Sequence, residues 1–217
     1  MIRILHKDAS MVVCIKPAGV LSESPGMPEM LSQELGVALS SSFVVHRLDR
    51  ETAGIMVYAL SSAAAQKLSL AFSEHRVRKT YLAVTGPVPD TFPGEGEWKD
   101  LLFFDRRQGK SFVSSRMRKN VKEAVLHYRI LSRDKSGTLF CMEPLTGRTH
   151  QIRVQSASRG LPLLGDRRYG GKGGTGLALF ACRLELMDGR VFEAMPPEEE
   201  PWSAFPGISD LLDVRHD

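Results

Sequence analysis

The sequence predicts an α+β fold that is rich in strands. Short runs with apolar residues at alternate positions occur along most of the chain, and they end in Gly, Pro, Asn or Asp residues that favour turns. Other segments place apolar residues three and four positions apart, as amphipathic helices do. No internal repeat and no long linker divides the 217 residues, so we expect one continuous domain over 1–217 with its core in 2–200.

The patterns in the first half of the chain predict alternating strands and helices. In order, they are a strand around Ile2 and Ile4, a buried strand at 11–15, a helix from Glu29 to Ser40, a strand, exposed loop and strand within 43–60, a helix from Ser61 or Ser62 to about His75, and a strand at 78–86. The apolar side of the second helix consists of Ala64, Leu68, Leu70, Ala71 and Phe72.

The second half begins with a segment rich in Pro and Gly, 87–110, which we interpret as a loop. The elements expected after it are strands near 111–117 and 122–131, a strand at 138–144, a helix within 148–160 that stops at Gly160, a loop at 165–176, and a hairpin that joins 178–186 to 190–194. The hairpin turn contains Asp188-Gly189, a favoured two-residue pair for such turns.

Composition excludes several classes of protein. With 42% hydrophobic and 25% charged residues, the chain is typical of a globular domain, and it contains no apolar stretch of 18 residues that would span a membrane. The N-terminus does not resemble a signal peptide, so we expect a cytoplasmic protein. Cys14, Cys141 and Cys182 are far apart and form no CxxC pair, which predicts neither a disulfide framework nor a metal site.

Basic residues are concentrated in one segment. Residues 106–135 contain ten Lys or Arg and two acidic residues, a charge of +8, which leaves −4 for the remainder of a chain whose net charge is +4. Such a local excess indicates a polyanionic partner, although a solvated surface hairpin would also carry it.

Two charged motifs contain candidate catalytic side chains. In the first, His46-Arg47-Leu48-Asp49-Arg50, an acid lies between two arginines in a loop between apolar strands, and a carboxylate kept ionised in this way can act as a nucleophile or a base. The second, 147–153, carries Arg148, His150 and Arg153 where a helix is expected to begin, a place suited to phosphate or carboxylate groups. Taken singly, an Arg–Asp pair on a tight turn is usually structural, and a single His at such a place is more often a hydrogen-bonding support.

Together with their neighbours, these motifs resemble those of the RluA family of pseudouridine synthases. The resemblance rests on six segments that span about residues 2–200: KPAGV, HRLDRETAGIMVYA, RKTYLAV, KEAVLHYRIL, TGRTHQIRV and GLPLLGDRRYGG. It implies a mixed, mostly antiparallel sheet with flanking helices and loops around a central RNA-binding cleft. It also implies an isomerase that flips a uridine out of the RNA and converts it to pseudouridine.

The resemblance further implies roles for particular residues. Asp49 matches the catalytic aspartate, Tyr81 the tyrosine that stacks on the target base, and Arg153 the arginine that pairs with the catalytic carboxylate. Arg47 matches an arginine that enters the RNA stack or meets a phosphate, and Ile152 the apolar wall of the pocket. The other residues expected to contact RNA are His46, Lys79, Arg116, Arg118, Lys119, Arg148 and Gln151.

The resemblance has departures and further implications. Three positions differ from the residues that the family commonly has: Ala53 replaces Ser, Gln155 replaces His, and Phe180 replaces His. These differences put only the finer contacts and the specificity in doubt. KPAGV begins at residue 16, so we expect a stand-alone catalytic domain without an S4 RNA-binding domain. The expected substrate is a stem-loop in ribosomal or transfer RNA, and we expect a monomer that needs no metal and no cofactor.

Two other functions compete with the synthase. A catalytically silent RNA-binding module would share the fold, but Asp49, Tyr81 and Arg153 are all present. A nucleoside or glycoside hydrolase would need a second carboxylate at a set distance from Asp49. The acids near the motifs are Glu51, Glu143 and Asp166; none is clearly paired with Asp49, and Asp166 is expected to hold its loop.

Overall fold

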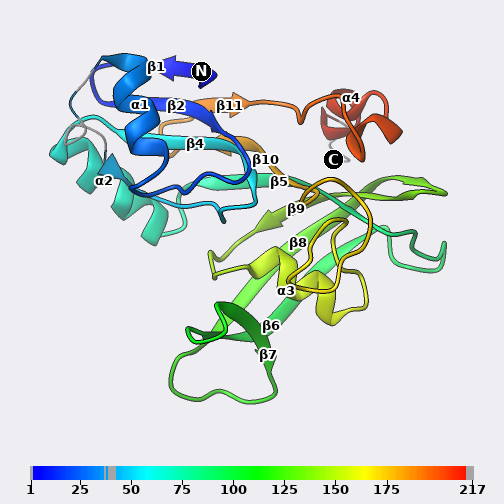
Figure 1. Cartoon of the computed structure of the whole chain (residues 1–217). Helices are drawn as coiled ribbons and strands as arrows, with labels where there is room; N and C mark the ends of the chain where they lie inside the picture. Colours follow the sequence, from blue (N-terminus) through cyan, green and yellow to red (C-terminus); the bar gives the residue numbers. More distant parts are fainter. Residues whose placement is uncertain (1, 37, 39–42, 214–217) are drawn as a thin grey trace. The chain divides into compact units, whose positions relative to one another are not determined.

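The computed structural model describes residues 2–36, 38 and 43–213 (Figure 1). The chain forms two compact units. Unit 1 comprises Met1–Lys79 and Phe180–Ala194, and unit 2 comprises Thr80–Leu179 and Met195–Asp217. Strands and helices occur in both units, which confirms the α+β class.

Unit 1 contains a mixed sheet with the order β1-β2-β4-β10, to which β3 and β11 add. Its strands are β1 (Ile4–Lys7), β2 (Met11–Lys16), β3 (Phe43–Val44), β4 (Ala53–Ala59), β10 (Leu179–Glu185) and β11 (Val191–Glu193). β4 and β10 run parallel, whereas β2 and β3 pair with β4 in the antiparallel sense, as β11 does with β10. The interior of β4 is fully buried, which fits its continuous apolar sequence. The hairpin predicted around Asp188-Gly189 is confirmed.

Two helices accompany this sheet. α1 (Met27–Leu35) ends at Gly36, whose positive φ of 63° is one that glycine adopts without strain, so the helix stops earlier than predicted. The predicted end of this helix, 39–40, lies outside the described residues. α2 (Ser62–Ser73) begins where predicted, because the Ser61 side chain accepts a hydrogen bond from the Ala64 N–H, and it contacts β3 and β4. Leu70, predicted on the apolar side of α2, is instead exposed.

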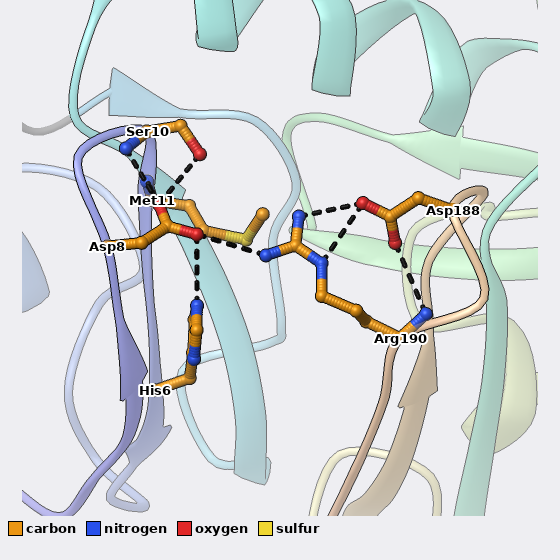
Figure 2. A network of polar contacts seen from close by, with 6 residues as sticks. All are labelled: His6, Asp8, Ser10, Met11, Asp188 and Arg190. Atoms are coloured by element: carbon orange, nitrogen blue, oxygen red, sulfur yellow. Dashed lines mark hydrogen bonds and ion pairs between the residues drawn. The ribbon is translucent and has the colours of Figure 1, made fainter.

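A network of polar contacts joins two turns of unit 1 (Figure 2). Asp8, in the turn between β1 and β2, accepts hydrogen bonds from the N–H groups of Ser10 and Met11 and from the Ser10 hydroxyl. Its other oxygen lies 3.0 Å from Arg190 Nη1, and Arg190 also donates to Asp188 in the turn between β10 and β11. The network therefore ties the N-terminal hairpin to a hairpin some 180 residues later in sequence.

Unit 2 contains an antiparallel sheet with the order β5-β9-β8-β6-β7. Its elements are β5 (Arg78–Thr85), β6 (Glu95–Asp105), β7 (Lys110–Ser114), β8 (Val121–Asp134), β9 (Gly137–Pro144), α3 (Gln151–Ser158), a 3-10 turn (Trp202–Ala204) and α4 (Ile208–Asp213). α3, drawn in yellow in Figure 1, contacts β6, β7 and β9. A core cluster of this unit includes Ile152 of α3 together with Trp98 and Phe140.

The sequence prediction for 87–110 of this unit is wrong. The segment 87–110 was expected to be a loop, yet it contains β6, which has 11 residues and pairs on both sides, with β7 and β8. Gly94 and Gly96 suggested a turn, but two neighbouring strands supply hydrogen bonds along the segment, and Trp98 and Leu102 are buried.

Among the described helices, none is long and apolar enough to cross a membrane.

Candidate functional site

Asp49 lies in the loop between β3 and β4 of unit 1, and it is half-buried. The residue before it anchors this loop, because Leu48 is buried and exchanges two hydrogen bonds with Ser22: the Leu48 N–H donates to Oγ at 3.0 Å, and the hydroxyl donates to the Leu48 carbonyl at 2.9 Å. On the other side, the Thr52 N–H donates to the Asp49 carbonyl. The backbone on both sides of the carboxylate is thus fixed.

Lys16, the last residue of β2, provides a second anchor for this loop. Its side chain is fully buried, and Nζ donates hydrogen bonds to the carbonyls of Pro17, Val20 and Arg50 at 2.9, 2.7 and 3.1 Å. Burial lowers the pKa of Lys16 to about 8, and the negative charges of Asp49 and Glu51 oppose that shift. Three carbonyl acceptors satisfy all three N–H donors, so one buried ammonium group joins the KPAGV segment to the loop of Asp49.

The two residues before Leu48 differ in their surroundings. Arg47 is exposed, and its guanidinium lies 3.3 Å from Glu23. The His46 ring stacks on Phe72, with centroids 4.4 Å apart, and its Nε2 accepts the Val57 N–H. Burial, and then the charge of Lys79, lower the pKa of His46 to about 3, so the ring is neutral and linked to β4. The RNA contacts of Arg47 and His46 both stay predictions.

Tyr81 and Lys79 lie on β5, two residues apart and therefore on the same face of the strand. Tyr81 is half-buried, lies opposite Met142 of β9, and packs against the core of unit 2. Lys79 is also half-buried, and burial lowers its pKa. The Tyr81 side chain is thereby supported by packing, as a residue that stacks on a base requires.

Arg153 lies in the first turns of α3, and its side chain is only 3% exposed. It forms a bidentate pair with Asp166, in which Nε and Nη2 each donate to a carboxylate oxygen at 2.8 Å. Asp166 also accepts the N–H of Tyr169 at 3.3 Å, so the prediction that this acid holds its loop is confirmed. The predicted pairing of Arg153 with Asp49 stays a prediction.

The entry to α3 is built differently from the sequence prediction. The helix begins at Gln151, not at Arg148, because His150 adopts a left-handed backbone with φ of 54°. The Gln151 side chain accepts hydrogen bonds from the Arg148 N–H and the Thr146 hydroxyl and donates to the Val125 carbonyl. Arg148 in turn donates to the Glu123 carbonyl, and Ile152 is a core residue. The RNA contacts predicted for these three residues stay predictions.

Gln155, one of the departures from the family pattern, is fully buried. Its Nε2 donates to the Trp98 carbonyl at 3.1 Å and to Asp100 at 2.7 Å, while Arg159 donates to the same Asp100 oxygen. Gln155 therefore links α3 to β6, and the departure concerns packing inside unit 2.

The basic segment, 106–135, contains the turn before β7, the whole of β7 and β8, and the connection between them. A surface hollow in this region is lined by Val113, Ser114, Ser115, Arg116 and Arg118. Arg116, Arg118 and Lys119 are exposed, and the Arg118 guanidinium lies 5.3 Å from the centre of the Phe103 ring. The region offers exposed cations beside an aromatic ring, a combination that suits a nucleic-acid backbone.

Comparison with known proteins identifies the family. Residues 10–158 match the model of the RNA pseudouridylate synthase family. The chain belongs to this family. It is an isomerase that converts uridine in RNA to pseudouridine, and the motifs that resemble the RluA family lie largely within the matched region.

Individual relatives agree with this assignment. The dual-specificity RNA pseudouridine synthase RluA of Yersinia pestis is 35% identical over 173 residues, which cover 76% of this chain and 81% of that protein. The ribosomal large subunit pseudouridine synthase D of Xylella fastidiosa is 35% identical, with coverage of 89% and 62%. The structure of human RNA pseudouridylate synthase domain containing 4 superimposes with a TM-score of 0.75 at 26% identity, and covers 90% of this chain and 88% of that chain.

Sequence reasoning overlooked two residues beside the candidate site. Lys16 was part of the KPAGV pattern, and its position directly after a buried strand was the available signal. Tyr169 belongs to GDRRYGG, three residues after Asp166, a spacing that places both in one tight turn. In the described part of the chain, no group of three or more His, Cys, Asp or Glu side chains is arranged to hold a metal ion.

Proposed function

We propose that the enzyme modifies uridines in stem-loops of ribosomal or transfer RNA, with Asp49 as its catalytic carboxylate. The observation that carries this proposal is the double anchoring of the Asp49 loop, by Ser22 at Leu48 and by Lys16 at Arg50. A loop without a chemical task has no need for a fully buried lysine beneath it, because burying an ammonium group costs free energy. The name of the Xylella relative, a ribosomal large subunit pseudouridine synthase, supports ribosomal RNA, and that of the Yersinia relative, a dual-specificity RNA pseudouridine synthase, supports RNA as the substrate.

The proposed reaction is an isomerisation, which leaves the atomic composition of the nucleotide unchanged. The N1–C1′ bond of the flipped uridine breaks, the base rotates, and a C5–C1′ bond forms. C5 then loses its hydrogen to solvent and N1 gains a proton. Asp49 either adds to the nucleotide or removes a proton from the sugar. Both routes require an ionised carboxylate.

We assign the other residues supporting roles in the same proposal. Tyr81 stacks on the flipped base, a contact that contributes about 1–3 kcal/mol. Arg153 keeps the Asp49 carboxylate ionised during the reaction. Lys79, Arg47 and Arg148 hold the RNA near the target, and the basic hollow binds phosphates beyond it. The enzyme acts as a cytoplasmic monomer without a metal or cofactor.

Tritium release tests this proposal. The protein is incubated with ribosomal and transfer RNA carrying uridine labelled with tritium at C5, and release to water is measured for wild type, Asp49→Asn and the control Asp90→Asn, an exposed turn residue. We expect release by wild type and the control, and none by Asp49→Asn. Bound RNA without release by any protein would indicate a silent binding module. Free uracil as the product would indicate a hydrolase.

A further inference from the structure

A buried cluster around Arg153 is not explained by the roles assigned so far. Asp166 has no exposed side-chain surface and takes two of the five N–H groups of the guanidinium. A planar guanidinium held at Nε and Nη2 cannot rotate about its last bonds, so its remaining N–H groups keep one direction. A lone arginine on a helix would lose more side-chain entropy on meeting a carboxylate.

Tyr169 supports the same guanidinium from its face. The ring centre lies 5.4 Å from Arg153 Cζ, and Tyr169 Oη is held by two partners: it accepts the Ser111 N–H at 2.8 Å and lies 2.9 Å from His150 Nδ1. Ser111 in turn donates its hydroxyl to the Thr149 carbonyl. The tyrosine is thus fixed by β7 on one side and by the residue before α3 on the other.

The loop that carries Asp166 and Tyr169 folds closely on itself. A side chain at Gly165 would come within 1.9 Å of the Gly176 carbonyl oxygen, and one at Gly171 within 1.9 Å of the Leu163 carbonyl oxygen. The N–H groups of Tyr169 and Gly171 both donate to the Asp166 carbonyl. These glycines permit a backbone path that places a carboxylate and an aromatic ring on one guanidinium.

We propose that Asp166 and Tyr169 are positioning residues of the synthase: they hold the Arg153 guanidinium in one orientation, so that it acts on the catalytic carboxylate without rearrangement. The inference rests on the proposed function, in which Arg153 supports Asp49. Neither residue touches the nucleotide in this assignment. Loss of either therefore lowers the rate of the chemical step and leaves RNA binding nearly unchanged.

The test compares Asp166→Asn with Asp100→Asn. The control removes a carboxylate that pairs with another arginine of the α3 region, Arg159, at the same distance of 2.8 Å. Three quantities are measured: the single-turnover rate constant for pseudouridine formation at saturating enzyme, the Kd for RNA, and the melting temperature. We expect Asp166→Asn to lower the rate constant by at least about tenfold and to change the Kd by less than about threefold, while Asp100→Asn keeps the rate constant.

A second variant keeps the inference testable should Asp166→Asn not fold. Tyr169→Phe retains the ring and removes the Oη contacts, and we expect a loss of about twofold to tenfold in the rate constant with an unchanged Kd. A rate constant at the wild-type level in whichever of the two variants folds, or an equal loss in Asp100→Asn, would overturn the inference. An Asp49→Asn enzyme as active as wild type would instead overturn the proposed function.

Discussion

At the scale of single residues, His46 is a neutral imidazole that the fold uses as a hydrogen-bond acceptor. Its Nε2 accepts the Val57 N–H, and its ring packs on Phe72. Protonation would remove the acceptor and place a cation in a buried position near Lys79. Acid should therefore loosen the start of the loop that carries Asp49.

We predict that His46 makes the enzyme less stable as the pH falls. The pKa of His46 is about 3 in the folded state and near 6.5 when unfolded, so between these values the unfolded state binds the additional proton. The stability contribution is present above pH 6.5 and is lost on acidification through this window. The variant His46→Gln keeps an acceptor. Between pH 7 and pH 4, its free energy of unfolding in urea should decrease less than that of wild type, by about 1–3 kcal/mol.

The exposed His127 provides the control for that prediction. The variant His127→Gln should follow the wild-type dependence on pH. Equal acid sensitivity in wild type and His46→Gln would show that the imidazole near Phe72 is not responsible.

At the scale of elements, the parallel pair β4–β10 depends on one glycine. Gly54 has φ of 128°, and a Cβ there would lie 2.4 Å from the backbone nitrogen and oxygen of Ala181. Backbone atoms of a neighbouring strand cannot move aside as a flexible side chain can. Gly54 of the HRLDRETAG motif therefore allows β4 and β10 to approach each other closely, directly after the loop of Asp49.

We predict that Gly54→Ala destabilises the enzyme by about 3 kcal/mol or more, because it combines a backbone clash with a strained φ. Gly86→Ala is the matched control, since nothing lies within 4 Å of its Cβ position and its φ is ordinary. Thermal unfolding and soluble yield of both variants provide the measurement. Equal melting temperatures for Gly54→Ala and Gly86→Ala would contradict this account of the strand pair.

The network of Figure 2 gives a second prediction at this scale. The pKa of Asp8 is lowered, first by its contact with His6 and then by Ser10, so its contribution is present above the unfolded value of 3.8 and is lost as the pH falls below it. A double-mutant cycle with Asp8→Ala and Arg190→Ala should give a coupling of about 0.5–1 kcal/mol at pH 7. The pair Arg183–Glu193, of similar exposure and within the β10–β11 hairpin, provides the comparison with an ion pair that does not link two hairpins. Absence of coupling between Asp8 and Arg190 would show that the two turns are held independently.

Several elements could be predicted because their sequence signals are local. Ser61 caps α2, Asp188-Gly189 turns the last hairpin, and the apolar run of β4 marks a buried strand. β6 could not be predicted in the same way, since its glycines and charges resemble a loop and only pairing with β7 and β8 reveals the strand. The start of α3 was also missed, because it depends on the left-handed backbone of His150.

The candidate residues divide along the same line. Asp49, Tyr81 and Arg153 follow from motifs that are contiguous in sequence. The bidentate contact between Arg153 and Asp166, 13 residues later, depends on the path of a glycine-rich loop, and no periodicity encodes that path. The three carbonyls around Lys16 come from two separate loops. No local sequence pattern could therefore predict that its ammonium group is buried.

At the scale of the whole molecule, the distribution of charge should affect RNA binding more than the net charge does. The net charge is only +4, but residues 106–135 carry +8. Because RNA phosphates hold condensed counterions, each cation that replaces one contributes to the dependence of binding on salt. Cations elsewhere on an otherwise acidic chain should contribute little to that dependence.

We therefore predict that the triple variant Arg116→Gln, Arg118→Gln and Lys119→Gln makes RNA binding less sensitive to salt. These side chains are exposed at the surface hollow or next to it in sequence, so the melting temperature should not change. Fluorescence anisotropy over a range of salt concentrations should give a slope of log Kd against log salt that is smaller by about 2. The control replaces Lys7, Lys67 and Arg76, three exposed cations of unit 1, by Gln. It removes the same formal charge, so an equal change of slope in both triples would mean that net charge, and not the basic segment, governs RNA binding. A change confined to the first triple places the phosphate contacts on the connection between β7 and β8.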